Sequence, residues 1–184
     1  MKVVSLGSDR LLFESTSEVR ARILMLAEAV EELRIIIFSP RGFTPEQISS
    51  KVWLYPTNSR NRWCYIFDAI KIGKSLLGPP VVTAQDPFES GLVAWWLARY
   101  HQCKLQLQIH TDVFNPHFIK RSFLNKIRVL LAKFLLPRAS SIRVVSQGIK
   151  NSLITNLQIS SDRIKVLPVF IDLEKLKQAP VKND

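Results

Sequence analysis

Short runs of apolar and β-branched residues recur along the chain, and longer segments between them repeat apolar residues every three or four positions. Short apolar runs bounded by polar or turn residues are typical of strands. We therefore predict strands at Val3 to Leu6, Ile35 to Phe38, Val52 to Tyr55, Val81 to Thr83, Leu105 to Ile109, Ile142 to Val145 and Ile164 to Val169.

The segments between these strands predict helices. In the first, apolar residues recur at helical spacing from Val19 to Leu33, while charged residues occupy the other faces. Ser15, with Glu18 three positions later, has the capping-box pattern that marks a helix start. We predict further helices at about Trp63 to Leu77, Phe88 to His101, Ser122 to Pro137 and Gln147 to Leu157.

Strands and helices therefore alternate almost throughout the chain. This order predicts an α/β fold, a Rossmann-like parallel sheet with helices on both faces. The chain has 184 residues, of which 47% are hydrophobic, and this length suits one domain with one substantial core. We assign that domain to residues 1–178 and interpret the polar residues 179–184 as a tail or the start of a linker.

The chain is strongly basic. An excess of 26 Lys and Arg over 15 Asp and Glu gives a formal charge of +11. Such a charge attracts anionic lipid, nucleic acid or phosphorylated substrates without choosing among them. No helix-turn-helix or aromatic-interleaved recognition motif is present in the sequence, so we expect no specific nucleic-acid partner.

The sequence also limits cofactors and location. Cys64 and Cys103 form neither a metal-ligand pattern nor a disulfide framework. No segment has the roughly 18 apolar residues of a membrane span, and the start is too short in its apolar stretch for a signal peptide. We expect a cytoplasmic protein without a metal or cofactor.

Polar residues follow four predicted strands, where this architecture places its ligand crevice. They are Ser5 to Arg10, Gln85 to Glu89, His110 to Asp112, and Ser146 to Gly148. Neither the G-x-G-x-x-G pattern of dinucleotide binding nor the phosphate-binding loop of nucleotidases is present in the sequence.

His110 is the strongest candidate for chemistry, because a histidine at a strand end can transfer a proton or hold a substrate hydroxyl near neutral pH. Gln106, Gln108 and His110 alternate with three apolar residues, so one face of this strand lies near a sheet edge or the crevice. A histidine that only satisfies local hydrogen bonds is the alternative.

The other candidates have structural alternatives as well. Gln85, Asp86, Glu89 and Asp112 are placed to line a ligand cleft, whereas each aspartate could instead shape a turn. Ser146 could present backbone N–H groups to an anion or only cap the helix that begins at Gln147.

A basic amphipathic segment extends from Phe118 to Arg138 without an acidic residue. Such a helix can lie on an anionic membrane surface, with Lys126, Arg128 and Lys133 as the expected contacts. The alternative is a helix that packs on the domain and leaves a solvated basic face.

The chain as a whole resembles family-4 glycosyltransferases. The resemblance is carried by the order of Val81 to Gly91, Ile109 to Asp112, Ala139 to Ser146 and Ile164 to Asp172, in which Pro168 and Asp172 match the strand, proline and turn before the family's second domain. By position, His110 matches the family's active-site histidine, and Asp86 with Glu89 match its crevice loop. The resemblance therefore makes these two residues, with Gln85, Asp112 and Ser146, the expected acceptor contacts. The stretch Leu11 to Glu14 departs from the family's often glycine-rich first loop.

The resemblance implies one half of a GT-B fold, the acceptor-binding half of a retaining enzyme that uses a sugar nucleotide and no obligatory metal. The nucleotide-sugar domain would follow after about Asp184, so we expect it from downstream sequence or a second polypeptide. The acceptor would be lipid-linked or a glycan in cell-envelope synthesis, at the inner face of the plasma membrane. A non-catalytic Rossmann-like binding module is the alternative.

Overall fold

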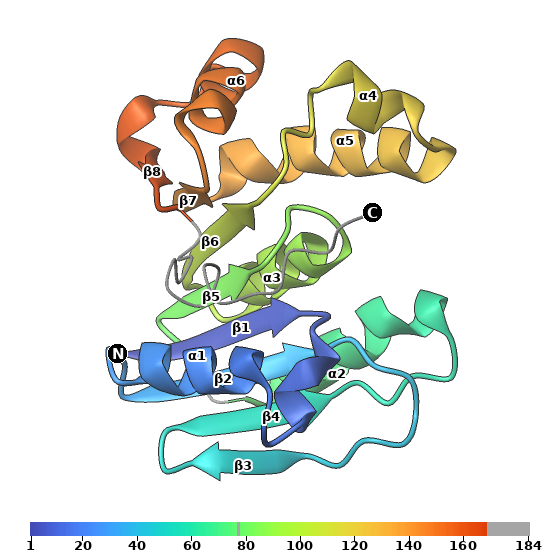
Figure 1. Ribbon diagram of the computed structural model, residues 1–184, viewed down its shortest axis with the longest axis vertical. Coiled ribbons are helices and arrows are strands. Elements are labelled where there is room, and N and C mark those ends of the chain that lie inside the picture. Colours follow the sequence, from blue (N-terminus) through green and yellow to red (C-terminus); the bar gives the residue numbers. More distant parts are fainter. Residues whose placement is uncertain (77, 169–184) are drawn as a thin grey trace, which may run out of the picture.

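The computed structural model describes residues 1–76 and 78–168, which form one eight-stranded sheet with helices packed against it (Figure 1). The strand order is β3-β4-β2-β1-β5-β6-β7-β8, and every neighbouring pair is parallel except β3 with β4. The strands are β1 Lys2–Gly7, β2 Glu32–Ile37, β3 Glu46–Ser49, β4 Val52–Pro56, β5 Val81–Ala84, β6 Lys104–Ile109, β7 Ser141–Val144 and β8 Ile164–Val166.

Helices connect most of these strands. The α-helices are α1 Glu18–Ala27, α2 Tyr65–Ser75, α3 Glu89–Tyr100, α4 Pro116–Lys120, α5 Phe123–Leu135 and α6 Gln147–Leu157. Short 3₁₀ turns occur at η1 Arg10–Phe13, η2 Arg62–Cys64, η3 Leu136–Arg138 and η4 Ser161–Arg163.

The predicted α/β class and the predicted strands are confirmed, with one strand missed. β3 is a polar edge strand that pairs antiparallel with β4, and it lacks the apolar run that marks the others. The short helix α4 was also missed. Some predicted positions lie outside the described residues, namely Leu77, Val169, Asp172 and the domain boundary at residue 178.

The first helix is shorter than predicted. α1 ends at Ala27, and Leu33 lies in β2, where it is paired with Val3 of β1. The capping box was assigned to the wrong serine, because Ser17 accepts the hydrogen bond from the Arg20 backbone N–H at 3.1 Å. The apolar residues of β2, which begins at Glu32, continue the helical spacing of α1 by chance, and the predicted helix was therefore too long.

The two faces of the sheet carry different amounts of helix. Helices α2, α3, α5 and α6 pack on one face and bury the larger apolar core around Leu6, Ile36 and Leu107. On the opposite face, α1 and η1 cover only β1, β2 and β4, where they bury a smaller cluster with Ile35 and Leu54. Helices therefore lie on both faces, as predicted, but the described helices cover one face over only half its width.

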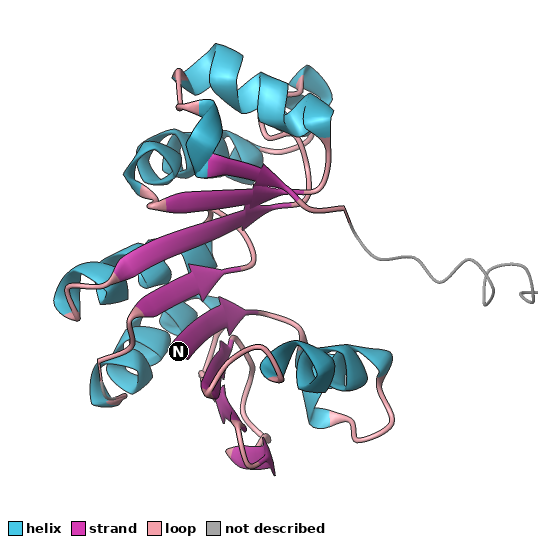
Figure 2. Ribbon diagram, turned by 90° about the vertical axis from the view of Figure 1, so that its left-hand side faces the viewer, coloured by secondary structure: helices cyan, strands magenta, loops and turns pink. Residues whose placement is uncertain are grey.

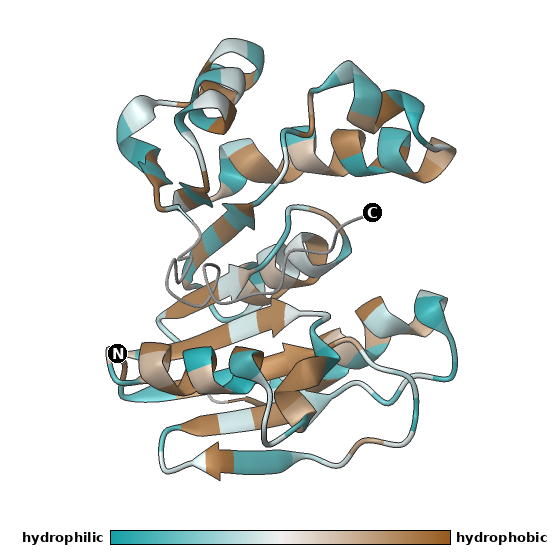
Figure 3. Ribbon diagram, in the orientation of Figure 1, coloured by the Kyte–Doolittle hydropathy of each residue, from teal (hydrophilic) through white to brown (hydrophobic). Residues whose placement is uncertain are grey.

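The uncovered half, which we call the open sheet face, is polar. In the described part of the chain, no helix crosses this side of strands β5 to β8 (Figure 2). The hydropathy of β6 alternates along its length as a strand buried on one side only requires (Figure 3). The face carries the side chains of Thr83, Lys104, Gln106, Gln108, Ser141, Arg143 and Lys165.

Hydrogen bonds join neighbouring strands across the open sheet face. The Thr83 hydroxyl donates to Gln106 Oε1 at 3.0 Å, and Arg143 Nη1 donates to Gln108 Oε1 at 3.2 Å. Such cross-strand polar contacts satisfy side chains that a helix would otherwise have to cover.

Candidate functional site

The predicted crevice residues follow strands that are neighbours in the sheet. Strands β1, β5, β6 and β7 lie side by side and are parallel, so their carboxyl ends share one edge. The strand order reverses between β1 and β5, because the chain builds outward in one direction through β2 and β4 and in the other through β6 to β8. Open α/β sheets bind ligands at such a reversal.

Gln85 lies directly at this reversal point. Its backbone N–H donates to the Leu6 carbonyl at 3.0 Å, and its side-chain amide packs against Gly7 of β1. A Cβ at Gly7 would come within 2.4 Å of Gln85 Oε1. The glycine therefore makes room for the Gln85 amide, a close approach that the sequence analysis did not recognise.

Asp86 shapes the turn from β5 into α3. Its Oδ1 accepts a hydrogen bond from the Phe88 backbone N–H at 2.9 Å, and the Ser90 hydroxyl donates to the Asp86 carbonyl at 3.3 Å. Burial raises the pKa of the Asp86 carboxyl, and the backbone N–H of Phe88 opposes that rise. Asp86 thus has a structural role at the crevice, and its predicted acceptor contact remains a prediction.

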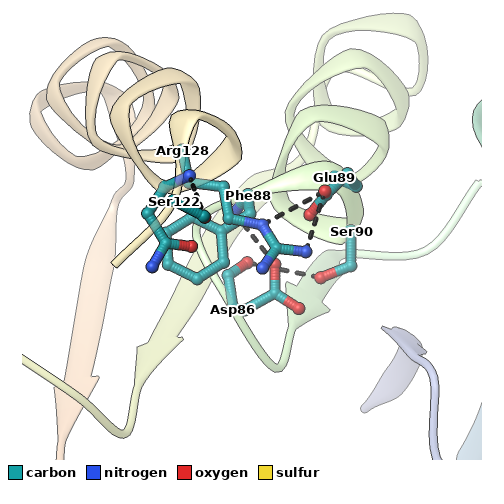
Figure 4. A network of polar contacts seen from close by, with 7 residues as sticks. Asp86, Phe88, Glu89, Ser90, Ser122 and Arg128 are labelled. Atoms are coloured by element: carbon teal, nitrogen blue, oxygen red, sulfur yellow. Dashed lines mark hydrogen bonds and ion pairs between the residues drawn. The ribbon is translucent and has the colours of Figure 1, made fainter. Parts of the chain in front are cut away.

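Glu89 and Arg128 join α3 to α5 beside this turn. Arg128 donates from Nε and Nη2 to Glu89 Oε1 at 3.2 and 3.0 Å. The guanidinium also lies over the Phe88 ring, 5.3 Å from its centroid (Figure 4). Glu89, which was predicted to contact an acceptor, is therefore paired with Arg128, which was predicted to contact a membrane.

His110 is exposed at the carboxyl end of β6. Its ring makes no hydrogen bond with any described residue. Partial burial lowers the pKa of His110, the nearby charge of Arg143 lowers it further, and Asp86 acts in the opposite direction. A lowered pKa keeps the imidazole neutral near pH 7, so that one nitrogen can accept a proton while the other donates a hydrogen bond.

Asp112 and Ser146 hold α6 in place. Asp112 Oδ1 accepts from the Phe114 backbone N–H at 3.0 Å and from the Ser152 hydroxyl at 2.9 Å. Ser146 is the N-cap of α6, and its hydroxyl accepts from the Ile149 backbone N–H at 3.3 Å. The structural alternative for each residue is therefore observed, and a direct ligand contact stays a prediction.

Two further features of this edge were not predicted from the sequence. Arg143 lies within β7, flanked by buried Ile142 and Val144, and its charge reaches His110. A basic residue inside a short apolar strand was the available signal. The second is a surface hollow of about 680 Å³ beyond the end of β1, lined by Ser8, Asp9, Arg10, Leu11, Phe13, Glu14 and Phe43.

Helix α5 turns an apolar and basic face to the outside. It buries Asn125, Val129, Ala132 and Leu135, whereas Lys126 and Lys133 are exposed without an ion pair to any described residue. No helix in the described part of the chain is long and apolar enough to cross a bilayer. The exposed apolar residues of α5 are Phe123, Leu124, Ile127, Leu130 and Phe134.

The mostly parallel sheet, its helices and its strand order define a Rossmann-like domain of the GT-B class. The Glycosyltransferase Family 4 profile matches residues 19–175, and the chain belongs to that family. No curated protein sequence matches the chain.

Solved structures share the fold at low sequence identity. The UDP-GlcNAc 2-epimerase of Methanocaldococcus jannaschii is 14% identical with a TM-score of 0.59, over 90% of this chain and 45% of that protein. Anabaena Alr3699/HepE, solved in complex with UDP and glucose, is 14% identical with a TM-score of 0.58, over 97% and 49%. The UDP-GlcNAc 2-epimerase of Neisseria meningitidis is 12% identical with a TM-score of 0.58, over 90% and 45%. The chain thus spans about half the length of these proteins.

Proposed function

We propose that this chain is the acceptor-binding half of a glycosyltransferase that transfers a sugar from a sugar nucleotide in cell-envelope glycan or glycolipid synthesis. The observation that supports it most is His110 at the carboxyl edge of a family-4 domain, because its pKa is lowered and its imidazole makes no hydrogen bond with a described residue. In this role His110 orients the acceptor or stabilises charge that develops in the transition state. The nucleotide-sugar domain would come from downstream sequence or from a second polypeptide.

The test replaces His110 in a complex with a complementary nucleotide-sugar domain. We expect His110→Ala to lower turnover more than about tenfold, which corresponds to roughly 1.4 kcal/mol of transition-state stabilisation. His117→Ala is the matched control, because His117 is exposed on α4 and its ring makes no hydrogen bond with a described residue. Unchanged turnover in a folded His110→Ala variant would favour the non-catalytic binding module.

A second test concerns the division of labour between the halves. We expect the chain by itself to bind no sugar nucleotide in the micromolar range, because its first loop has no glycine-rich phosphate motif. Titration calorimetry with uridine and guanosine diphosphosugars measures this. Saturable binding near 1 μM, about 8 kcal/mol, would show that the acceptor assignment is wrong.

We further propose that the protein works at an anionic membrane surface and that α5 contacts the lipid. Phe123, Ile127, Leu130 and Phe134 share the outer face of α5 at helical spacing. Lys126 and Lys133 add positive charge that no described acidic residue pairs. Each basic side chain near an anionic surface contributes on the order of 1 kcal/mol, which salt screens.

A second exposed group supports this orientation. At the start of α2, Trp63 is 85% exposed and Phe67 is 74% exposed, with Arg60 and Arg62 beside them in the sequence. Helices α2 and α5 follow strands of the sheet's parallel part, so both helices begin on the side of the crevice (Figure 1). A membrane contacted by both groups would face the crevice, where a lipid-linked acceptor must enter.

Vesicle co-sedimentation tests the membrane contact. We expect Lys126→Glu, Lys133→Glu to lose binding to anionic vesicles at low salt, whereas adding Arg128→Glu changes little more because Arg128 is already paired with Glu89. Arg22→Glu, Lys104→Glu changes the charge equally at exposed positions away from α5 and should still bind. Equal binding by both double variants, or no binding of the unmodified chain, contradicts the proposal.

A further inference from the structure

The open sheet face carries an unbalanced positive charge. Lys104, Arg143 and Lys165 all lie on it, and its described members include no acidic residue. Arg143 and Lys165 are register partners on β7 and β8, so two like charges are direct neighbours across the strands. Like charges in this arrangement repel and destabilise a sheet unless an anion lies between or above them.

Arg143 has only neutral partners among the described residues. Its Nη1 donates to Gln108 Oε1 at 3.2 Å, and its Nη2 lies 3.5 Å from the Leu167 carbonyl oxygen. Its Nε is buried and finds no acceptor in the part of the chain that the structure describes. A partly buried guanidinium without a carboxylate is costly to the fold, since burying a charge is unfavourable unless an opposite charge accompanies it.

The unpaired guanidinium lies beside the crevice. Arg143 is one residue from the end of β7, and its register partner Gln108 is two residues from His110 on the neighbouring strand. Gln108 shares the open sheet face with its register partner Arg143, and His110 follows the last residue of β6 at the carboxyl end of that strand. Arg143 is close enough to His110 for its charge to act on the imidazole.

We infer that Arg143 and His110, with Lys165 beside them, form a binding subsite for a phosphoryl group at the edge of the crevice. The fork of the guanidinium matches two phosphate oxygens, and an ammonium and an imidazole N–H supply further donors. The inference rests on the proposed function in one respect: it assigns the phosphoryl group to the acceptor, since a lipid-linked acceptor carries phosphate between lipid and sugar.

The test is an NMR titration of the histidine imidazoles against pH, with and without inorganic phosphate. A bound anion offsets the charge of Arg143, so the lowered pKa of His110 should rise as millimolar phosphate is added. His101, which is hydrogen-bonded to the Gly73 carbonyl, and His117, on α4, are internal controls that should not change. A His110 pKa that phosphate leaves unchanged would overturn the inference.

Variants on the same face make the test specific. We expect Arg143→Gln to weaken phosphate binding about tenfold or more, because a charge-assisted bidentate contact is lost. Arg143→Lys keeps the charge but not the fork and should weaken binding less. Lys104→Gln removes a charge from the opposite end of the open sheet face and should leave binding unchanged. An equal phosphate response in folded Arg143→Gln and unmodified protein would contradict the assignment to Arg143.

Two further ligands identify the source of the phosphoryl group. Decyl phosphate stands for a lipid-linked acceptor and uridine diphosphate for a donor. A stronger effect of decyl phosphate on His110 supports the acceptor assignment, whereas a stronger effect of uridine diphosphate overturns it. These measurements do not depend on sugar transfer. The phosphoryl subsite can therefore be disproved while the His110→Ala turnover test supports the proposed function, and the proposed function can be disproved while the subsite is supported.

Discussion

The two halves of the sheet are built by different rules. Strands β1, β2 and β4 are covered on both faces, by α1 and η1 on one side and by α2 and α3 on the other. Within residues 1–76 and 78–168, strands β5 to β8 are covered on one face only, and their other face is polar. The N-terminal half therefore holds its strands between two apolar layers, whereas the C-terminal half presents side chains that a ligand or another polypeptide can contact.

The difference explains where the candidate chemistry lies. His110 and Arg143 both belong to the half with the open face, and Gln85 and Asp86 lie where the two halves meet. In the strands covered on both sides, Lys2 and Arg34 are paired with Glu32. Among the described residues, these strands therefore supply no unpaired charged side chain. The half-covered strands can carry such residues while their other face still builds the larger core.

The largest expected effect comes from truncating equivalent faces of the two halves. Ile35 of β2 points to the side covered by α1 and is 2% exposed, so we expect Ile35→Ala to cost about 2–5 kcal/mol in the free energy of unfolding. Gln106 of β6 points to the same side of the sheet without a helix above it. We expect Gln106→Ala to cost only about 1 kcal/mol, for its hydrogen bond with Thr83.

Urea unfolding of both variants checks this prediction. If the two halves differ as described, Ile35→Ala should lose clearly more free energy of unfolding than Gln106→Ala, because only Ile35→Ala leaves a cavity in an apolar layer. Losses of similar size would mean that the open sheet face is packed as tightly as the covered one, and the comparison of the two halves would fail.

The same contrast shows how much of the fold the sequence could predict. Ile35, Ile36 and Ile37 are consecutive and all buried, which indicates a strand covered on both faces. Gln106 and Gln108 alternate with buried leucines, which indicates a strand covered on one face. β3 escaped prediction because an antiparallel edge strand needs no apolar run, only a neighbour with free backbone groups.

The candidate site was predictable in its location but not in its contacts. Strand ends identified Asp86 and His110, because parallel topology brings successive strand ends to one edge. The pairing of Glu89 with Arg128 joins residues 39 positions apart, and only packing of α3 against α5 reveals it. The close contact of Gly7 with Gln85 was missed for the same reason, since the two residues are distant in sequence.

A smaller effect is expected at two glycines on the covered side of the C-terminal half. A Cβ at Gly91 of α3 would lie 2.7 Å from the Asp86 carbonyl oxygen, so we expect Gly91→Ala to destabilise the protein by about 1–3 kcal/mol. A Cβ at Gly148 of α6 would meet only Ser146 Oγ, at 3.8 Å. Gly148→Ala should therefore stabilise by about 0.4–1 kcal/mol through helix propensity and chain entropy.

Thermal or urea unfolding distinguishes these two substitutions. Changes in the free energy of unfolding of opposite sign would show that the covered face of the C-terminal half is tightly packed at Gly91. They would also show that it is loosely packed at the start of α6. A neutral Gly91→Ala would mean that the turn after β5 shifts at little cost. The covered face would then resemble the open one in its tolerance of change.

The smallest expected effect concerns the charge of Asp86, where the two halves meet. Burial raises the pKa of Asp86 above its ordinary value of 3.8, so the folded protein binds this proton more tightly than the unfolded chain. The contribution of Asp86 to the free energy of unfolding therefore falls as the pH rises from 3.8 through the folded-state pKa. Above that pKa, the buried carboxylate destabilises the fold by its full amount. Asp86→Asn retains an oxygen to accept from the Phe88 N–H, and we expect it to be more stable than the unmodified protein at pH 7.

Urea unfolding between pH 4 and pH 7 measures this difference, which should narrow as the pH approaches 3.8. Asp162→Asn is a control of opposite sign, because a hydrogen bond from the Ser160 hydroxyl lowers the pKa of Asp162. Its carboxylate stabilises the fold above pH 3.8, and that stabilisation is lost as the pH falls through the folded-state pKa. An Asp86→Asn variant that is less stable at pH 7 would mean that the Asp86 carboxylate is stabilised at the junction of the halves. The polar surroundings found on the open sheet face would then also include Asp86, at the reversal of strand order between β1 and β5.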